Sequence, residues 1–444
     1  MEIKLFNSLT NEIENFVPLK KGEVSIYTCG PTVYDYVHIG NLRPVVVFDV
    51  LRNLFEYLGY KVIFVSNYTD IDDKIINKAL SEGVSEEVIS NRYIKAYEEN
   101  VKELNANVPT VTPRVSESIE EIIDFISVLI KKGGAYENDG EVFFDVTKDS
   151  NYGELSHVNP DELEHGSRVE ENAKKKHPGD FLLWKKTSEG ITFSSPWGEG
   201  RPGWHTECVV MINKTFNKPL IDIHGGGFDL KFPHHENEIA QSRIYGGTHL
   251  ANYWMHNGFI NVNNEKMSKS LGNTLTGNDF INKYGGNVLR LLLLSSHYRA
   301  PLNVTEEVIE SSEKSLERIE NSVRQLGVFL RLRKLDEIAK EAQIAEFIAQ
   351  LADDLNTSNA LTVLFAKVKE INMALRAREK DIDLLQQHYV DVMEMLNILG
   401  IKIDIPEIDE NDIQLYKEYI EAKQSHNFEK SDKLRILLTE RKIL

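Results

Sequence analysis

The sequence predicts an α/β protein: a domain built on a parallel sheet is split by an insertion, and an α-helical bundle and a small C-terminal helical region follow. Three observations predict this fold class. Strand-like runs and amphipathic helices alternate over the first 100 residues, an irregular pattern replaces them up to about residue 200, and helical spacing of apolar residues dominates beyond Thr305. The chain of 444 residues is long enough for several domains.

The first strand–helix–strand unit indicates whether the sheet is parallel. A short strand-like run at Val24–Tyr27 precedes a helix predicted near Leu42–Leu58, where apolar residues recur every three or four positions. Gly59 suits the end of that helix, and an apolar strand follows at Lys61–Ser66. Strand, helix and strand in this order predict a Rossmann-like parallel sheet, whose ligands bind beyond the carboxyl ends of the strands.

The insertion and the second half of the sheet domain come next. In the insertion we expect a helix near Ser116–Lys132, a strand at Val142–Val146 and a polar loop through Lys174–Gly179. The sheet domain then resumes with a helix after Cys208, a strand at Leu220–His224, a helix over Pro233–Tyr245, a strand at Trp254–Val262 and a loop at Glu265–Ser270.

The last third of the chain reads as helices. They are expected over Val308–Leu326, Ile344–Leu355, Thr357–Arg378, Asp383–Leu399, Ile413–Gln424 and Glu429–Arg441. We therefore divide the chain into 1–98 (first half of the sheet domain), 99–200 (connective insertion), 201–304 (second half, with the lysine-containing loop), 305–400 (helical bundle) and 401–444 (C-terminal helical region).

Composition excludes several classes of protein. A net charge of −18 argues against a general nucleic-acid binder, although it leaves room for a local basic face. Two cysteines cannot form a disulfide framework, which indicates a reducing compartment. The first twenty residues hold no apolar run with a basic flank, and no apolar run is long enough to span a bilayer, so we expect a cytoplasmic protein without a membrane segment.

Two motifs have the chemistry of a phosphate site. The strand at Val24–Tyr27 breaks at Gly30, and the chain enters the next helix through His38-Ile-Gly-Asn41. A helix start offers free N–H groups, and Gly40 lets a ligand approach the backbone. Lys266-Met-Ser-Lys-Ser270 places Lys266 and Lys269 on a loop, where ammonium groups could stabilise a leaving pyrophosphate. Helix capping or a solvated basic loop would explain either motif alone, but not both in one sheet domain.

A metal site is a second possibility. Cys29 and Cys208 follow strand-like segments, and His234 and Glu238 are four residues apart and share a helix face. These side chains form a zinc-compatible set, with His235 and Glu236 as competing candidates. Two buried apolar cysteines beside a solvated His–Glu pair explain the same pattern.

The chain resembles a known family. His38–Asn41 with Lys266–Ser270 is similar to the signature pair of class I aminoacyl-tRNA synthetases. Within that class the chain resembles cysteinyl-tRNA synthetases through Cys29–Tyr34, Asn67–Lys74, Gly203–Cys208, His224–Glu238 and Asp353–Ala360. The likeness runs from residue 1 to about residue 440.

The resemblance implies a catalytic domain formed by the two sheet halves, and a helical bundle that carries the tRNA and its anticodon. It implies activation of L-cysteine by ATP with Mg²⁺, transfer to tRNA(Cys), and one Zn²⁺ per chain that selects the thiolate without an editing domain. It further implies a monomer. Cys29, Cys208, His234 and Glu238 match the family's zinc ligands one for one.

The resemblance also implies roles for individual residues. For catalysis these are His38, Asn41, Lys266 and Lys269; for ATP, Gly30, His38, Gly40, Asn41, His224 and Lys269; for cysteine, Cys29, Thr69, Trp204 and His205. Structural roles explain His205, His224, Thr69 and the neighbouring Asp70 equally well, and Trp254 and His256 are candidates for the adenine pocket.

Two departures from the family pattern stand out. Asn41 replaces a second motif histidine, so this position can donate a hydrogen bond but cannot be cationic. The family usually continues past residue 444 with a segment of the anticodon region, so we expect a shortened C-terminal region with an effect on tRNA affinity. Two alternatives share many of these features: a cysteine ligase that acylates a small amine, as in the mycothiol pathway, and a zinc-containing RNA-binding or regulatory paralogue.

Overall fold

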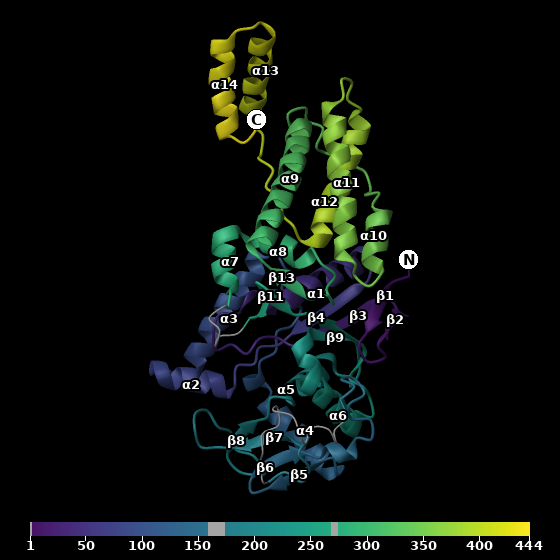
Figure 1. Cartoon of the computed structure of the whole chain (residues 1–444), viewed down its shortest axis with the longest axis vertical. Coiled ribbons are helices and arrows are strands. Elements are labelled where there is room, and N and C mark those ends of the chain that lie inside the picture. Colours follow the sequence, from purple (N-terminus) through teal and green to yellow (C-terminus); the bar gives the residue numbers. More distant parts are fainter. Residues whose placement is uncertain (1, 159–173, 268–273) are drawn as a thin grey trace. The chain divides into compact units, whose positions relative to one another are not determined.

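The computed structural model describes residues 2–158, 174–267 and 274–444, except for the side chain of Lys266. The chain forms two compact units (Figure 1). Unit 1 comprises Met1–Lys283 and Tyr298–Val304, and unit 2 comprises Tyr284–His297 and Thr305–Leu444. Over the described residues, no helix combines the length and hydropathy needed to cross a membrane.

A four-stranded parallel sheet organises unit 1, which confirms the predicted fold class. Its order is β10-β9-β3-β4, and the strands are β3 (Glu23–Thr28), β4 (Lys61–Ser66), β9 (Ile221–Gly227) and β10 (Ala251–Asn257). Helix α1 (Ile39–Tyr57) connects β3 to β4. The chain leaves β3 for β4 on one side, whereas β9 pairs with β3 on the other. This reversal creates the crevice at which open parallel sheets bind ligands.

The insertion continues the core of unit 1. Helices α2 (Asp73–Glu82) and α3 (Glu86–Glu103) precede it, and it contains α4 (Ile119–Lys131) and an antiparallel sheet of order β5-β6-β7-β8. The strands of that sheet are Ala135–Asn138, Glu141–Phe144, Phe181–Lys186 and Gly200–Pro202. Buried residues of the insertion, such as Trp184, join one hydrophobic cluster with Tyr27 and Trp254 of the parallel sheet. The insertion is therefore packed onto the parallel sheet.

The second half of unit 1 departs from the predictions at two places. The strand predicted over Trp254–Val262 is two strands, because β10 ends at Asn257 and β11 (Ile260–Val262) pairs with β12 (Glu265–Lys266) and β13 (Leu302–Val304). The break occurs where the Gly258 N–H donates to the Tyr298 carbonyl, 2.8 Å away. The helix predicted from Pro233 changes type: α6 spans Glu236–Gly246, and an irregular π-helical turn over Lys231–His235, in which Phe232 is extended, precedes it.

Other elements of unit 1 complete its frame. Helix α5 (Glu207–Phe216) follows β8, and α7 (Gly277–Tyr284) reaches the boundary of the unit. A hairpin that we did not predict, β1 (Lys4–Asn7) and β2 (Glu12–Asn15), lies next to β10, and the N–H of Ser8 donates to the Trp254 carbonyl at 2.8 Å.

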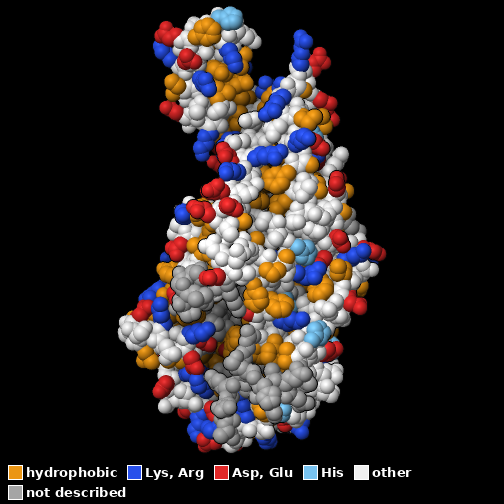
Figure 2. All heavy atoms as spheres, in the orientation of Figure 1, with side chains coloured by type: hydrophobic (Ala, Val, Ile, Leu, Met, Phe, Trp, Pro, Cys, Tyr) orange, Lys and Arg blue, Asp and Glu red, His pale blue; other side chains and the backbone are white. Residues whose placement is uncertain are grey.

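Unit 2 is helical, as predicted. Its helices are α8 (Gly286–Leu294), α9 (Glu306–Arg331), α10 (Ala345–Ala352), α11 (Thr357–Arg376), α12 (Ile382–Leu399), α13 (Glu410–Gln424) and α14 (Phe428–Glu440). Helices α9, α11 and α12 pack against one another, and α13 pairs with α14. Figure 2 shows Lys and Arg side chains interspersed with Asp and Glu on one face of these helices. Such mixing is typical of solvated helical surfaces.

Candidate metal centre and nucleotide-binding edge

The segments that follow β3 and β4 lie side by side at the carboxyl edge of the sheet. The Val33 N–H donates to the Thr69 carbonyl and the Thr69 N–H donates to the Pro31 carbonyl, both at 3.2 Å. The side-chain Oδ1 of Asn67 accepts a hydrogen bond from the Gly30 N–H at 2.9 Å. A Cβ atom on Gly30 would lie 1.6 Å from the Asn67 carbonyl oxygen, so only glycine allows this approach. The pairing holds Cys29 at the sheet edge.

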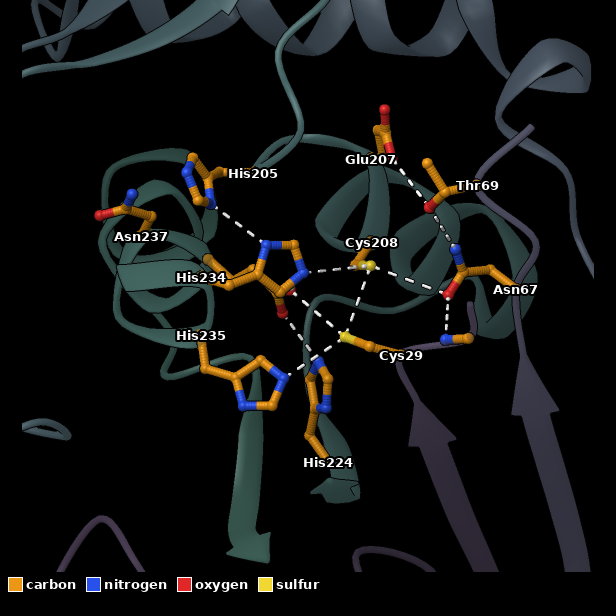
Figure 3. Close-up of polar contacts among 12 residues, drawn as sticks. Cys29, Asn67, Thr69, His205, Glu207, Cys208, His224, His234, His235 and Asn237 are labelled. Atoms are coloured by element: carbon orange, nitrogen blue, oxygen red, sulfur yellow. Dashed lines mark hydrogen bonds and ion pairs between the residues drawn. The ribbon is translucent and has the colours of Figure 1, made fainter. Parts of the chain in front are cut away.

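The four predicted metal ligands converge on this edge. Figure 3 shows three of them, Cys29, Cys208 and His234. Cys29 Sγ lies 3.6 Å from Cys208 Sγ on α5 and 3.7 Å from Glu238 Oε1 on α6. His234 Nε2, in the turn before α6, lies 3.7 Å from Cys208 Sγ and 2.8 Å from Glu238 Oε1. Zinc–ligand bonds of about 2.0–2.3 Å in a tetrahedron place ligand atoms about 3.3–3.8 Å apart. Three of the four distances fall in that range, so the donor set fits zinc.

A second group of donors overlaps the first. Cys29 and Glu238 also lie close to His224 and His235, and the ligand atoms of all four are within 4.8 Å of one another. His235 Nε2 is 3.3 Å from Cys29 Sγ, so this competing candidate does reach the site. Glu236 belongs to neither group, because its Oε2 accepts a hydrogen bond from the Ser156 N–H at 2.7 Å. The predicted set is the one that contains both sulfur atoms, which zinc prefers.

The pKa values of the four predicted ligands are shifted in different directions. Burial and the neighbouring Cys208 raise the pKa of Cys29 well above its usual range. A hydrogen bond from Cys29 lowers the pKa of Cys208 to about 6, although burial opposes this shift. Burial by itself lowers the pKa of His234, but Glu238 and Cys208 together raise it to about 10. Burial raises the pKa of Glu238, but His224 and His234 hold it well below its usual range.

Histidines surround the donors. His224 Nε2 lies 2.7 Å from Glu238 Oε2, and no part of either side chain is exposed. Such a partner orients a metal-binding carboxylate from outside the coordination sphere. His235 Nδ1 lies 2.8 Å from His256 Nε2, and His256 Nδ1 lies 2.8 Å from Ser8 Oγ. His224 also stacks on the buried Trp254, so its contact with ATP stays a prediction, as do the adenine roles of Trp254 and His256.

The predicted cysteine-binding residues Trp204 and His205 both contact His234. The Trp204 ring, which is 42% exposed, stacks on the His234 ring at a centroid distance of 4.5 Å. His205 Nδ1 lies 3.1 Å from His234 Nδ1. The two side chains therefore form a wall beside the donor set, open to solvent at the indole.

Thr69 and Asp70 differ in what they contact. The Thr69 hydroxyl lies 3.3 Å from both Asn67 Nδ2 and Glu207 Oε2, beside Cys208. Asp70 instead accepts hydrogen bonds from the backbone N–H and the hydroxyl of Ser116, at 3.0 and 2.5 Å. These hydrogen bonds give Asp70 a structural role, which is one of the two roles that the sequence left open for it. Glu207 and Asn67 were not among the predicted site residues, although both lie within motifs that carry the family resemblance.

The first phosphate motif lies at the start of α1, and Met267 of the second motif lies near it. Asn41 Oδ1 accepts a hydrogen bond from the His38 N–H at 3.2 Å and thereby caps the start of α1. A Cβ atom on Gly40 would lie 3.2 Å from Cε of Met267, the residue after Lys266. Beyond it, the Ile39 N–H donates to the Leu275 carbonyl at 3.0 Å. Met267 and Leu275 therefore lie beside the start of α1, while Lys269 and the side chain of Lys266 lie outside what the structure describes.

Comparison with known proteins identifies the family. The family model for the class I (C) tRNA synthetase catalytic domain matches residues 15–314, and the DALR domain model matches residues 346–404. A protein of Brevibacillus brevis named "Cysteine--tRNA ligase" is 46% identical over 456 residues, covering 100% of this chain and 97% of that protein. One of the same name from Halalkalibacterium halodurans is 45% identical, covering 98% of this chain and 95% of that protein.

Solved structures support the fold alone. Methionyl-tRNA synthetase of Mycobacterium tuberculosis, in complex with methionyl-adenylate, aligns with a TM-score of 0.61 at 14% identity over 85% of this chain and 90% of that one. Arginyl-tRNA synthetase of Thermus thermophilus aligns with a TM-score of 0.54 at 13% identity over 90% of this chain and 85% of that one. The matched domains and the full-length relatives show that the chain belongs to the cysteine--tRNA ligase family of class I aminoacyl-tRNA synthetases, which are ATP-dependent ligases.

Proposed function

We propose that the chain activates L-cysteine with ATP to cysteinyl-adenylate, transfers the cysteinyl group to tRNA(Cys), and uses Zn²⁺ at Cys29, Cys208, His234 and Glu238 to select the cysteine thiolate. The observation that carries this proposal is the convergence of two sulfur atoms, an imidazole and a carboxylate just after β3, the strand that leads into α1. Substrate selection and ATP binding would then share one sheet edge.

Selection of cysteine over serine needs more than shape. The two amino acids have nearly the same size, and a packing pocket separates such substrates by only about 1–3 kcal/mol. Bound Zn²⁺ would supply a Lewis acid that accepts a soft, acidic thiol far more readily than a hydroxyl. His224 Nε2 lies 2.7 Å from Glu238 Oε2 and would orient this carboxylate as a ligand. Trp204 packs over His234, which would be another ligand.

The chain contributes position and charge to the adenylation step. The cysteine carboxylate attacks the α-phosphorus of ATP, so no protein nucleophile is required and catalysis depends on alignment and charge stabilisation. His38, Gly40 and Asn41 at the start of α1 would hold the phosphates with Mg²⁺. Lys266 and Lys269 would stabilise the departing pyrophosphate, and the position of Met267, whose Cε would lie 3.2 Å from a Cβ atom on Gly40, supports this arrangement.

The tRNA partner is assigned to the helical part of the chain. The DALR model matches residues 346–404, which cover α10 to α12. We propose that these helices and the α13–α14 pair bind tRNA(Cys), and that the chain acts as a monomer. A terminal ribose hydroxyl of the tRNA would then attack the acyl-adenylate and release AMP.

The test uses the full 444-residue chain in two assays. Cysteine-dependent ATP–pyrophosphate exchange measures adenylate formation, and charging of a tRNA(Cys) transcript measures transfer. We expect both activities, loss of both after chelation, and their return when Zn²⁺ is restored. Absence of exchange would overturn the proposal, whereas exchange without charging would overturn the tRNA step and favour a small-amine acceptor. Cys208→Ser should lower bound zinc and cysteine affinity together; unchanged zinc content would remove Cys208 from the ligand set.

A further inference from the structure

Glu207 is a buried carboxylate that the ligand set does not use. It is the first residue of α5, precedes Cys208 and is 2% exposed. Its carboxylate accepts a hydrogen bond from the Thr69 hydroxyl, with Oε2 and Oγ1 3.3 Å apart. Over the side chains that the structure describes, no Lys, Arg or His nitrogen lies within ion-pair distance of Glu207. A carboxylate in this setting lacks the cation that normally accompanies a buried charge.

The surroundings of Glu207 favour the approach of a cation. The Glu207 carboxylate is almost fully buried and accepts a hydrogen bond from the neutral hydroxyl of Thr69. A positively charged ligand group beside the carboxylate would lower the cost of the charged form. The ammonium group of the substrate would then be the positive partner of an ion pair whose negative partner is Glu207.

The hydrogen bonds of the Thr69 hydroxyl define its donor and acceptor roles. Asn67 Nδ2 donates to Oγ1 at 3.3 Å, and Thr69 in turn directs its O–H to Glu207. A hydroxyl has one proton and two acceptor lone pairs, so this arrangement leaves Thr69 one lone pair with which to accept. The backbone of Thr69 is held on both sides by Pro31 and Val33. Glu207 and Thr69 together present acceptors and negative charge, which match an ammonium group.

The positions of Thr69 and Glu207 relative to the sulfur atoms suit an α-amino acid. Asn67 Oδ1 lies 3.9 Å from Cys208 Sγ, while Nδ2 of the same amide contacts Thr69. One side-chain amide therefore separates the sulfur cluster from the Thr69 hydroxyl, as Figure 3 shows for Glu207, Thr69, Asn67 and Cys208. In cysteine, two carbon atoms separate the thiol from the ammonium nitrogen.

We propose that Glu207 is a positioning residue for the α-ammonium group of cysteine: it fixes the Thr69 hydroxyl as a hydrogen-bond acceptor and supplies the negative charge beside it. This inference rests on the proposed function, because it takes cysteine as the substrate whose thiol lies at the metal. Two neighbouring residues would then recognise the two functional groups of the substrate. Cys208 would act on the thiol through the metal, and Glu207 would act on the ammonium group through Thr69.

The test compares two ligands on the zinc-loaded full chain by titration calorimetry. L-cysteine carries the ammonium group, and 3-mercaptopropionate keeps the thiol and carboxylate without it. Glu207→Gln preserves shape but removes the charge. We expect it to weaken cysteine binding about tenfold or more, the usual effect of losing a hydrogen bond to a charged group, and to leave the binding of 3-mercaptopropionate within about twofold.

Three further variants separate positioning from structural damage. Thr69→Val should reproduce the selective loss of cysteine binding, and Thr69→Ser should restore it because the hydroxyl remains. Glu236→Gln is the matched control: it changes another buried glutamate in the first turn of a helix, so the ratio of the two affinities should equal that of the unmodified chain. Zinc content is measured for each variant.

The possible results are distinct. Equal weakening of both ligands in Glu207→Gln and Thr69→Val, or no weakening of either, overturns the role of Glu207 and leaves the proposed function intact. Failure of the unmodified zinc-loaded chain to bind cysteine overturns the proposed function, and this inference with it. Should Glu207→Gln not fold, the Thr69→Val and Thr69→Ser pair decides between selective and general loss.

Discussion

At the scale of single residues, the shifted pKa values determine which donor side chains are protonated before any metal binds. The raised pKa values of Cys29 and His234 keep both groups protonated at neutral pH, while the lowered values of Cys208 and Glu238 leave those groups charged above about pH 6. Metal ligands must be deprotonated, so binding has to expel the protons of Cys29 and His234.

We therefore predict that Zn²⁺ binding at pH 8 releases about two protons and that affinity for the metal rises steeply with pH. The sign follows from the raised pKa values, since a group that loses its proton on binding favours the complex at higher pH. Calorimetry in buffers of different ionisation enthalpy gives the number of protons directly. Release of one proton or none would contradict the protonated state of His234. Below about pH 6, a third proton, from Cys208, should appear.

The sequence offered the donor set as a candidate but did not show its supporting contacts. Buried cysteines beside a solvated His–Glu pair explained the same pattern. Cys29, Cys208, His234 and Glu238 stand out as metal ligands only through the family resemblance. Asn67 and Glu207 do not, because an amide and a carboxylate are common types whose role depends on where a side chain points after α5 has packed. His235 reaches Cys29 from an irregular turn, and its direction could not be read from helical spacing.

At the scale of elements, the end of α12 is fixed by a buried arginine of α8. The Arg290 side chain, which has no exposed surface, donates through Nε to the Leu399 carbonyl at the carboxyl end of α12. Gly400 follows with φ of 67°, and a Cβ atom there would lie 2.2 Å from the Arg290 guanidinium. Both the backbone conformation and the space require glycine.

Gly400→Ala should therefore destabilise the chain more than an equivalent change in open space. Gly83, at the end of α2, has φ of 66°, and a Cβ atom added there would meet nothing within 4 Å. Gly83→Ala therefore carries only the left-handed backbone cost of about 1–2 kcal/mol. We expect Gly400→Ala to cost at least about twice that amount, because Arg290 must also move. Denaturant unfolding of both variants measures the difference. Equal losses would show that Arg290 moves aside freely.

The insertion contacts α2 through charges. Asp73, the first residue of α2, pairs with Arg201 of β8 and with Lys185 of β7, whose Nζ is 2.6 Å away. Burial raises the pKa of Asp73, but the two basic groups lower it below its usual value. Since the folded-state pKa is the lower one, the stabilisation is present above the unfolded value of about 3.9 and is lost as pH falls through the folded value.

Asp73→Asn should lower the free energy of unfolding by about 1 kcal/mol or less at pH 7, because Asp73 is half exposed. The difference from the unmodified chain should stay constant down to about pH 5 and shrink below about pH 4. Thermal unfolding between pH 3 and pH 7 provides the measurement. Asp139→Asn, at an exposed pair with Lys174 and Lys186, is the matched control and should have a smaller effect. A pH-independent difference for Asp73→Asn would point to packing instead of charge.

Element prediction succeeded where local pattern determines structure. The strand–helix–strand unit and the helices of unit 2 follow from apolar spacing, which tertiary packing reinforces. The strand predicted over Trp254–Val262 failed because the break depends on the Gly258 N–H meeting Tyr298, a residue forty positions later. The β1–β2 hairpin was missed because its strands of four residues show little alternation.

At the scale of the whole molecule, the candidate metal centre lies entirely within unit 1. Anything that binds the folded state alone stabilises it, by about 4 kcal/mol when the ligand is at 1,000 times its dissociation constant. Chelation should therefore increase hydrogen exchange in peptides from β3, α5 and α6, and leave α9 and α11 of unit 2 unchanged. Mass-spectrometric hydrogen exchange with and without Zn²⁺ tests this. Equal changes in both units would mean that they unfold together.

The spacing of the donors along the chain also fixes when the centre can form. Cys29 is separated from Cys208 by 179 positions and from Glu238 by 209, and the whole insertion lies between. Synthesis proceeds from the N-terminus, so Cys29 leaves the ribosome long before its partners exist. The metal can be captured in full only after α6 has emerged and the insertion has packed onto the sheet. Acquisition of zinc at the proposed centre would then be a late event in the synthesis of unit 1, and a loaded centre would indicate that the segments which bring its ligands together have already folded.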